Sequence, residues 1–257
     1  MVELAATRLS GSPDSEALLV VGPSLGTSVT ALWGRCASLL EGLEVLGWDL
    51  PGHGRSPAAA TPFSVAALAA AVRELATAAA SGRETWYAGV SLGGAVGWEL
   101  ALDPGPFAAV AALASAPKIG EPGAWRDRAG LVRRAGTPVM VASSVQRWFA
   151  PGFTDRYPDD AGALLMSLSD ADAGSYAFAC EALAAFDVRD GVTGAKVPVL
   201  AAAGEHDAVL PPELVRAAAP TTAFAVVRGC GHLPPAEDPA AVATLLTDFL
   251  TTQRADR

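Results

Sequence analysis

The stretch YAGVSLGGAVGW (residues 87–98) places a serine, Ser91, between glycines that lie two positions away on each side. This spacing matches G-x-S-x-G, a pattern in which a strand turns sharply into a helix with the serine on the turn. Glycine is needed at both ends because a side chain there would clash with neighbouring backbone. The apolar run before Ser91 and the helix-compatible run after it fit this turn. We predict that Ser91 is a nucleophile, and the alternative is a plain glycine-rich connection.

Short apolar runs recur on both sides of this turn. They cover residues 17–22, 43–48, 85–90, 108–114, 197–203 and 223–228. Strands that are apolar along their whole length are typical of a parallel sheet covered by helices on both faces. Residues 62–80 carry apolar side chains at helical spacing, and Asp238 and Pro239 fit the cap and first turn of a final helix. The alternation predicts an α/β fold with a mostly parallel sheet flanked by helices.

Residues 118–190 interrupt this alternation, because they contain no convincing strand. They are rich in aromatic residues and arginines, and a proline and a glycine lie near their ends. We expect residues 1–117 and 191–257 to form one core, with residues 118–190 inserted as a helical lid.

A serine needs a base and an orienting carboxylate to act as a nucleophile. On this kind of turn the three groups follow the chain order serine, acid, histidine. Among the three histidines of the chain, His232 alone follows both Ser91 and a well-placed acid, Asp207, just past a strand end. We predict the triad Ser91, Asp207 and His232, with Glu205 as a rival carboxylate. The alternatives are a turn histidine and a capping aspartate.

Two backbone N–H groups are expected to bind the oxyanion of a tetrahedral intermediate. The first belongs to Leu92, directly after the nucleophile. The loop VVGPSLGTS (residues 20–28) follows an early strand, and Leu25 is its candidate donor. A plain turn is the alternative for this loop. His53, in the loop WDLPGHGRSP (residues 48–57), precedes the serine and is expected to be structural.

The formal net charge of −9 argues against nucleic acid or an anionic membrane as a partner, since both require a basic face. The three cysteines are too far apart for a metal site or a disulfide framework. We see no signal peptide and no apolar run long enough to span a membrane. A cytoplasmic protein without metal or cofactor is expected, and its oligomeric state, including a homo-oligomer, is left open.

Through the predicted triad and the oxyanion loop, the chain resembles the α/β-hydrolase family over essentially its whole length. Within that family it resembles the 3-oxoadipate enol-lactone hydrolases of aromatic degradation by the β-ketoadipate pathway. Three stretches carry this narrower resemblance: PSLGTSVTALW (23–33), SSVQRWFAPGF (143–153) and GSYAFACEALAAFDVRD (174–190). The chain departs from the pattern at Pro23, where asparagine is common, and at Phe178 and Ala179.

The resemblance implies a small anionic lactone as substrate. Ser91 would attack the lactone carbonyl and form an acyl-enzyme, with His232 as base. A substrate carboxylate needs a cation in this acidic protein, and arginine binds carboxylates bidentately. The lid supplies the candidates for substrate binding: Arg128 and Arg133, with Arg134 and Arg147 as further cations, and Trp125 and Trp148 as walls for the ring. The alternative for these residues is a solvated lid surface and a lid core.

Other functions are compatible with the same triad. A small-ester carboxylesterase and a cofactor-free haloperoxidase or perhydrolase would use the same three residues. A hydrolase-fold ligand receptor without turnover belongs to a different class. Turnover of the enol-lactone separates the lactonase from the other enzymes, and covalent labelling of Ser91 separates enzymes from a receptor.

Overall fold

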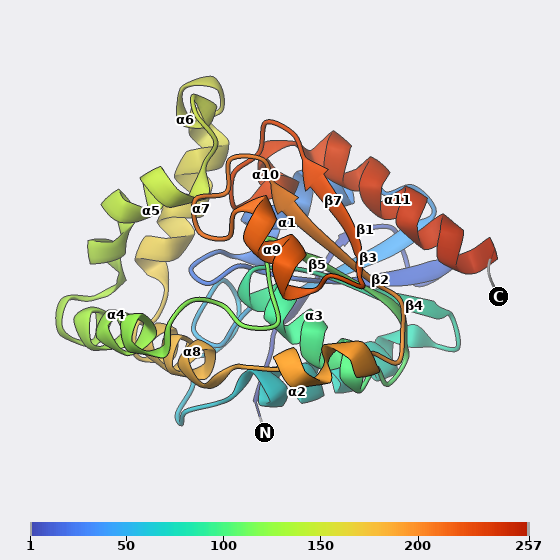
Figure 1. The fold of residues 1–257 in the computed structure, drawn as a ribbon, viewed down its shortest axis with the longest axis horizontal. Coiled ribbons are helices and arrows are strands. Elements are labelled where there is room, and N and C mark those ends of the chain that lie inside the picture. The colour runs from blue at the N-terminus through green and yellow to red at the C-terminus, as the bar shows by residue number, and fades with distance from the viewer. Residues whose placement is uncertain (1, 256–257) are drawn as a thin grey trace.

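A mostly parallel sheet runs through the computed structural model, which describes residues 2–255 (Figure 1). Its seven strands lie in the order β1-β3-β2-β4-β5-β6-β7, and β1 alone is antiparallel to its neighbour. The strands are β1 (Ala6–Ser10), β2 (Ala17–Gly22), β3 (Leu43–Trp48), β4 (Glu84–Val90), β5 (Phe107–Leu113), β6 (Val199–Gly204) and β7 (Ala223–Val227).

Helices cover both faces of this sheet (Figure 1). They are α1 (Val29–Ala37), α2 (Val65–Ala80), α3 (Leu92–Leu102), α9 (Pro212–Ala218), α10 (Pro234–Glu237) and α11 (Pro239–Ala255). Every residue of β2 and β6 is buried, as the continuous apolar runs predict for strands enclosed on both faces. The Oδ1 atom of Asp238 accepts the N–H of Ala241 at 2.9 Å, so the predicted cap of the last helix is confirmed.

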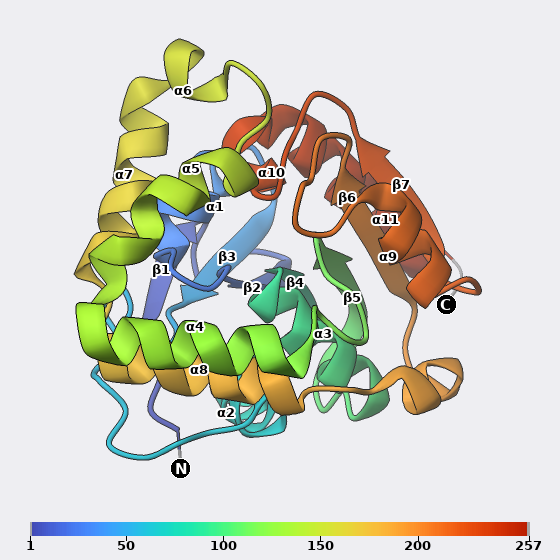
Figure 2. The same cartoon turned by 60° about the vertical axis from the view of Figure 1, so that its left-hand side comes forward.

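The chain between β5 and β6 is helical. It contains α4 (Pro122–Ala135), α5 (Val141–Trp148), α6 (Phe153–Arg156), α7 (Pro158–Asp170) and α8 (Ala173–Ala185), with 3-10 turns at Thr137–Met140 and Arg189–Gly194. We call residues 118–190 the cap segment. Figure 2 shows α4 and α8 side by side, with α7 running past α1. The predicted α/β fold with a helical insertion is confirmed.

Among residues 2–255, none of the helices combines the length and the apolar composition that a bilayer crossing requires.

Candidate active site

Ser91 lies on the turn between β4 and α3, and its backbone is strained. Its φ of 56° and ψ of −110° lie in a region that residues with a side chain rarely adopt. The N–H of Ser91 donates to the carbonyl oxygen of Leu113 at 2.9 Å, which ties the turn to the end of β5. Ser91 is only 7% exposed. The structure therefore holds Ser91 in a strained backbone conformation and largely buried.

The two flanking glycines allow this turn to close. A Cβ atom on Gly89 would overlap the carbonyl oxygen of Gly93. A Cβ atom on Gly93 would lie 2.6 Å from the carbonyl oxygen of Pro23, which accepts the Gly93 N–H at 2.9 Å. The Tyr87 hydroxyl also donates to the Gly93 carbonyl oxygen at 2.8 Å. Neither glycine position has room for a side chain.

Asp207 and His232 form a buried pair. The Nδ1 atom of His232 lies 2.8 Å from Oδ2 of Asp207, and the exposed fractions of the two side chains are 3% and 0%. The other carboxylate oxygen accepts the N–H groups of Val209 at 2.8 Å and Leu210 at 2.9 Å, which fixes the carboxylate just after β6. A proton on Nδ1 shared with this carboxylate leaves Nε2 as the acceptor that a serine hydroxyl requires.

The rival groups lie elsewhere. Glu205 is exposed, and its carboxylate accepts the N–H of Gly229 at 2.8 Å. His53 is buried, and its Nδ1–H donates to the carbonyl oxygen of Pro51 at 2.9 Å. Burial lowers the pKa of His53 to about 4, against the opposing effects of the Pro51 bond and of Asp172. His53 is therefore a neutral histidine inside the loop after β3.

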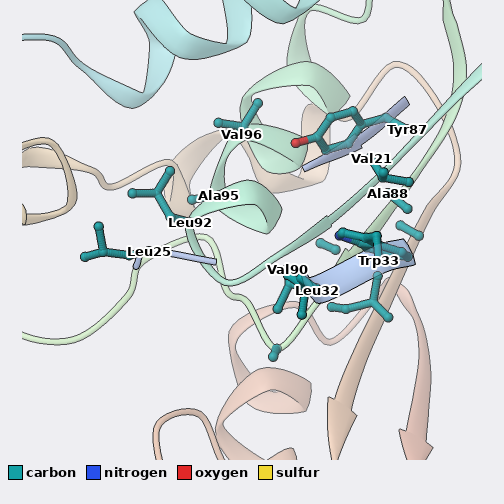
Figure 3. Close-up of a cluster of buried hydrophobic side chains, with 14 of the residues drawn as sticks. Val21, Leu25, Leu32, Trp33, Tyr87, Ala88, Val90, Leu92, Ala95 and Val96 are labelled. Atoms are coloured by element: carbon teal, nitrogen blue, oxygen red, sulfur yellow. The ribbon is translucent and has the colours of Figure 1, made fainter. Parts of the chain in front are cut away.

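The two expected oxyanion donors lie on adjacent backbone segments. Leu92 is the first residue of α3, and Leu25 lies in the loop after β2 that the Gly93–Pro23 hydrogen bond joins to α3 (Figure 3). Within residues 2–255, neither the N–H of Leu25 nor that of Leu92 donates a hydrogen bond. The N-terminus of a helix favours developing negative charge. Both N–H groups are therefore available to an oxyanion.

Arg128 lies inside the cap segment beside aromatic rings. Its guanidinium lies over the ring of Trp125, 4.6 Å from the centroid, and close enough to the buried Tyr176 for its charge to act on the pKa of that hydroxyl. Burial raises the pKa of Tyr176 to about 12. The pKa of Arg147 is lowered by burial and by the nearby charge of Arg128. In the described part of the chain, neither arginine forms an ion pair with a carboxylate.

Arg133 lies apart from this pair of arginines. It is exposed and binds the carboxylate of Glu181 bidentately at 2.6 Å and 2.9 Å. The Nε1–H group of Trp125 donates to the carbonyl oxygen of Ile119 at 2.6 Å, so one edge of this indole is occupied. The indole of Trp148 is buried, and a Cβ atom on Gly26 would lie 3.4 Å from it. Trp148 thus covers the loop that carries Leu25.

Tyr176 and Glu237 also lie in this region, and neither is predicted as a site residue from the sequence motifs. Tyr176 lies in one of the stretches that carry the family resemblance, which is the signal that could have found it. Glu237 contacts the cap segment 87 residues earlier in the chain, and no local pattern reveals that contact. Among residues 2–255, no three histidine, cysteine or acidic side chains gather in a way that could hold a metal ion.

Known proteins share this architecture and sequence. A model of the alpha/beta hydrolase family matches residues 18–245. The chain is 35% identical to 3-oxoadipate enol-lactonase 2 of Acinetobacter baylyi over 200 residues, which cover 77% of this chain and 74% of that protein. The solved enol-lactonase of Burkholderia xenovorans LB400 has a TM-score of 0.90 at 29% identity, over 97% of both chains. A thermophilic esterase from Thermogutta terrifontis has a TM-score of 0.88 at 23% identity, covering 98% of this chain and 94% of that chain.

The last of these similarities concerns the fold alone. The first three bear on the family, and they confirm the resemblance that the sequence motifs carry. The chain therefore belongs to the alpha/beta hydrolase family.

Proposed function

We propose that this chain is a serine hydrolase that opens the lactone ring of 3-oxoadipate enol-lactone to give 3-oxoadipate. The observation that carries the proposal is the buried Asp207–His232 pair, which follows the strained Ser91 turn in the chain order that the chemistry requires. The two relatives named as enol-lactonases support the choice of substrate. The product would place the enzyme in the degradation of aromatic compounds, in the cytoplasm.

In the acylation step, the hydroxyl oxygen of Ser91 attacks the lactone carbonyl carbon and gives its proton to Nε2 of His232. The N–H groups of Leu25 and Leu92 bind the oxyanion of the tetrahedral intermediate. The ring C–O bond then breaks, and the leaving enolate takes up the proton from His232 and becomes a ketone. The open chain stays attached to Ser91 as an ester.

In the deacylation step, His232 takes a proton from a water molecule as this water attacks the acyl carbon. The ester bond to Ser91 breaks and the proton returns to the serine oxygen. The new carboxylic acid releases its proton to solvent, and 3-oxoadipate leaves as a dicarboxylate. Asp207 holds the imidazole in the same orientation through both steps and stabilises its protonated form. His232 therefore accepts and returns one proton in each step.

Arg128 and Arg147 are the proposed site for the carboxylate that the lactone carries. Both are cations inside the cap segment, and in residues 2–255 no protein carboxylate is paired with either. An anionic ligand would offset their mutual repulsion, and arginine suits the planar geometry of a carboxylate. Trp125 and Trp148 are proposed as apolar walls for the ring. Arg133 is bound to the carboxylate of Glu181 and is not part of the proposed site.

The deciding experiment is a spectrophotometric assay with the enol-lactone. We expect kcat/KM to be well above the value for p-nitrophenyl acetate, and we expect Ser91→Ala to abolish both activities and the labelling by a fluorophosphonate. Efficient turnover of simple esters with none of the enol-lactone would identify a carboxylesterase instead. A folded wild-type protein that resists labelling would point to a receptor without turnover.

A further inference from the structure

The cap segment meets the loop of the catalytic histidine through backbone atoms. The N–H of His232 donates to the carbonyl oxygen of Trp148 at 2.8 Å. Gly231 makes this approach possible, because a Cβ atom there would lie 2.7 Å from both the Trp148 carbonyl oxygen and the Ala150 nitrogen. The position of His232 is therefore tied to the position of residues 148–150.

The carboxylate of Glu237 binds both of these backbone segments. The Oε2 atom of Glu237 accepts the N–H of Ala150 at 2.7 Å. Its Oε1 atom accepts the N–H groups of Gly231 at 2.9 Å and Leu233 at 3.1 Å. Hydrogen bonds to an ionised carboxylate are shorter and stronger than those between neutral groups. Glu237 thus joins the cap segment to the two residues on either side of His232.

Glu237 is itself held in place by the fold. It ends the single turn of α10, which begins with the buried Pro234 and Pro235 and packs against α1 (Figure 2). The N–H of Glu237 donates to the carbonyl oxygen of Leu233 at 3.2 Å. Burial raises the pKa of Glu237, and its three backbone hydrogen bonds act in the opposite direction. The carboxylate is therefore fixed to the core and reaches the cap segment from there.

We propose that Glu237 is a positioning residue that places His232 for catalysis by tying its loop to residues 148–150 of the cap segment. The contacts that carry this proposal are the three hydrogen bonds to the carboxylate and the bond from His232 N–H to Trp148. We call these four bonds the clasp. The proposal rests on the proposed function, since it requires that His232 act as the base.

The clasp has a second connection to the site through Trp148. The indole of this residue lies against Gly26, the neighbour of Leu25, and its carbonyl oxygen receives the N–H of His232. One residue of the cap segment therefore contacts both the loop of an oxyanion donor and the loop of the base. A shift of residues 148–150 would disturb both groups, and Glu237 opposes that shift.

The test compares Glu237→Gln and Glu237→Ala with the control Glu205→Gln. Glu205 is a suitable control because its carboxylate also accepts a backbone N–H from the loop of His232, that of Gly229. Unlike Glu237, it is exposed and does not contact the cap segment. In Glu237→Gln, only one side-chain atom can accept hydrogen bonds. This variant therefore keeps the bonds to one of the two backbone segments and turns its own N–H₂ group toward the N–H donors of the other. Alanine removes both sides.

Each variant is assayed for turnover of p-nitrophenyl acetate, for the rate of fluorophosphonate labelling of Ser91 and for its unfolding temperature. We expect Glu237→Ala to lower kcat and the labelling rate on the order of 10²-fold with little change in KM, since misplacement of a catalytic group by about 1 Å has effects of that size. Glu237→Gln should lie between this variant and the wild type, and Glu205→Gln should match the wild type. The downfield proton resonance of His232 Nδ1 should broaden or shift in the Glu237 variants alone.

The outcomes separate this proposal from the function on which it rests. Wild-type protein that is not labelled overturns the serine-hydrolase mechanism and the clasp with it. Wild-type protein that is labelled, with Glu237 variants that are labelled equally fast and turn over equally well, overturns the clasp alone. A lowered unfolding temperature with unchanged kcat also overturns it, because that is the signature of a purely structural carboxylate. If Glu237→Ala does not fold, Glu237→Gln decides.

Discussion

Asp207 and His232 share a 2.8 Å hydrogen bond between two side chains that solvent barely reaches. In Asp207→Asn, the amide N–H₂ can face His232 Nδ1 and stabilise the wrong tautomer, in which Nε2 carries the proton. We expect kcat to fall by on the order of 10³–10⁴-fold while the protein stays folded. Steady-state kinetics on p-nitrophenyl acetate measure this loss. Glu205→Gln is the control, and an equal loss in it would reassign the acid.

Replacement of Ser91 by glycine should raise stability while it removes activity. The φ of 56° at Ser91 is unfavourable for any residue with a Cβ atom and acceptable for glycine. Strain of this kind costs about 1–3 kcal/mol. The free energy of unfolding of Ser91→Gly should therefore exceed that of Ser91→Ala, which keeps the Cβ atom. Denaturant titration of the two inactive variants makes the comparison, and equal stabilities would show that the turn is unstrained.

The glycine two positions before the nucleophile should not tolerate alanine. In Gly89→Ala the new Cβ atom would overlap the carbonyl oxygen of Gly93, and the backbone of the turn would have to move. Overpacking of this kind costs about 1–3 kcal/mol. Gly162→Ala is the matched control, because nothing lies within 4 Å of a Cβ atom at that position of α7. We expect this control to gain about 0.5–1 kcal/mol, since glycine is a poor residue inside a helix. Thermal unfolding reports both changes.

Arg128 should matter for charged substrates only. Hydrogen bonds to charged groups contribute about 1.5–3 kcal/mol, so Arg128→Gln should lower kcat/KM for the enol-lactone by about 10–100-fold. Turnover of the neutral p-nitrophenyl acetate should change little. Arg133→Gln serves as the control on the same helix, because Arg133 is bound to Glu181 at the surface. Equal effects of Arg128→Gln on both substrates would show that this arginine only supports the cap segment.

His53 should make the protein sensitive to acid. Its pKa is about 4 in the folded protein, below the ordinary 6.5, so the unfolded chain binds more protons between these two values. Stability is therefore fully present above pH 6.5 and decreases as the pH falls toward 4. The shift corresponds to about 3 kcal/mol. We expect His53→Gln to lose this part of the acid dependence. Denaturant titrations from pH 7 to 4 test it, and His206→Gln, at an exposed position, should behave as the wild type.

Sequence patterns predict the central strands well, because such strands need apolar side chains on both faces. The run at residues 223–228 was expected to be buried on both faces as well, but β7 is mostly exposed or half-buried because it lies at the edge of the sheet. The run expected at residues 17–22 coincides with β2, and all of its residues are buried. The edge strand β1 was missed. Its five residues are exposed or half-buried, and only Ala6 and Leu9 are apolar, so no continuous apolar run marks it. An antiparallel edge strand solvated on one side leaves a much weaker signal.

The candidate triad could also be selected from sequence, because each residue comes after a strand of the sheet, within five residues of its end, and the chain order is fixed by the fold. The contacts inside the cap segment could not be predicted from the sequence. Arg128 and Arg133 are both on α4, five residues apart, and so point about 140° away from each other. The sequence does not reveal which of the two faces inward. Pairing of Arg133 with Glu181 depends on how α4 packs against α8.

The hydrogen bond between His232 and Trp148 has a consequence for the exchange of cap segments between related enzymes. Residues 118–190 could be replaced by those of another hydrolase to change the substrate range of this protein. The exchange would also replace the carbonyl group that accepts the His232 N–H and the N–H group that Glu237 binds. If these contacts position His232 as proposed, an active chimera requires a new segment that brings a carbonyl and an N–H back to those two points in space. Grafts that leave residues 148–150 native, and vary α4 and α8, avoid this requirement.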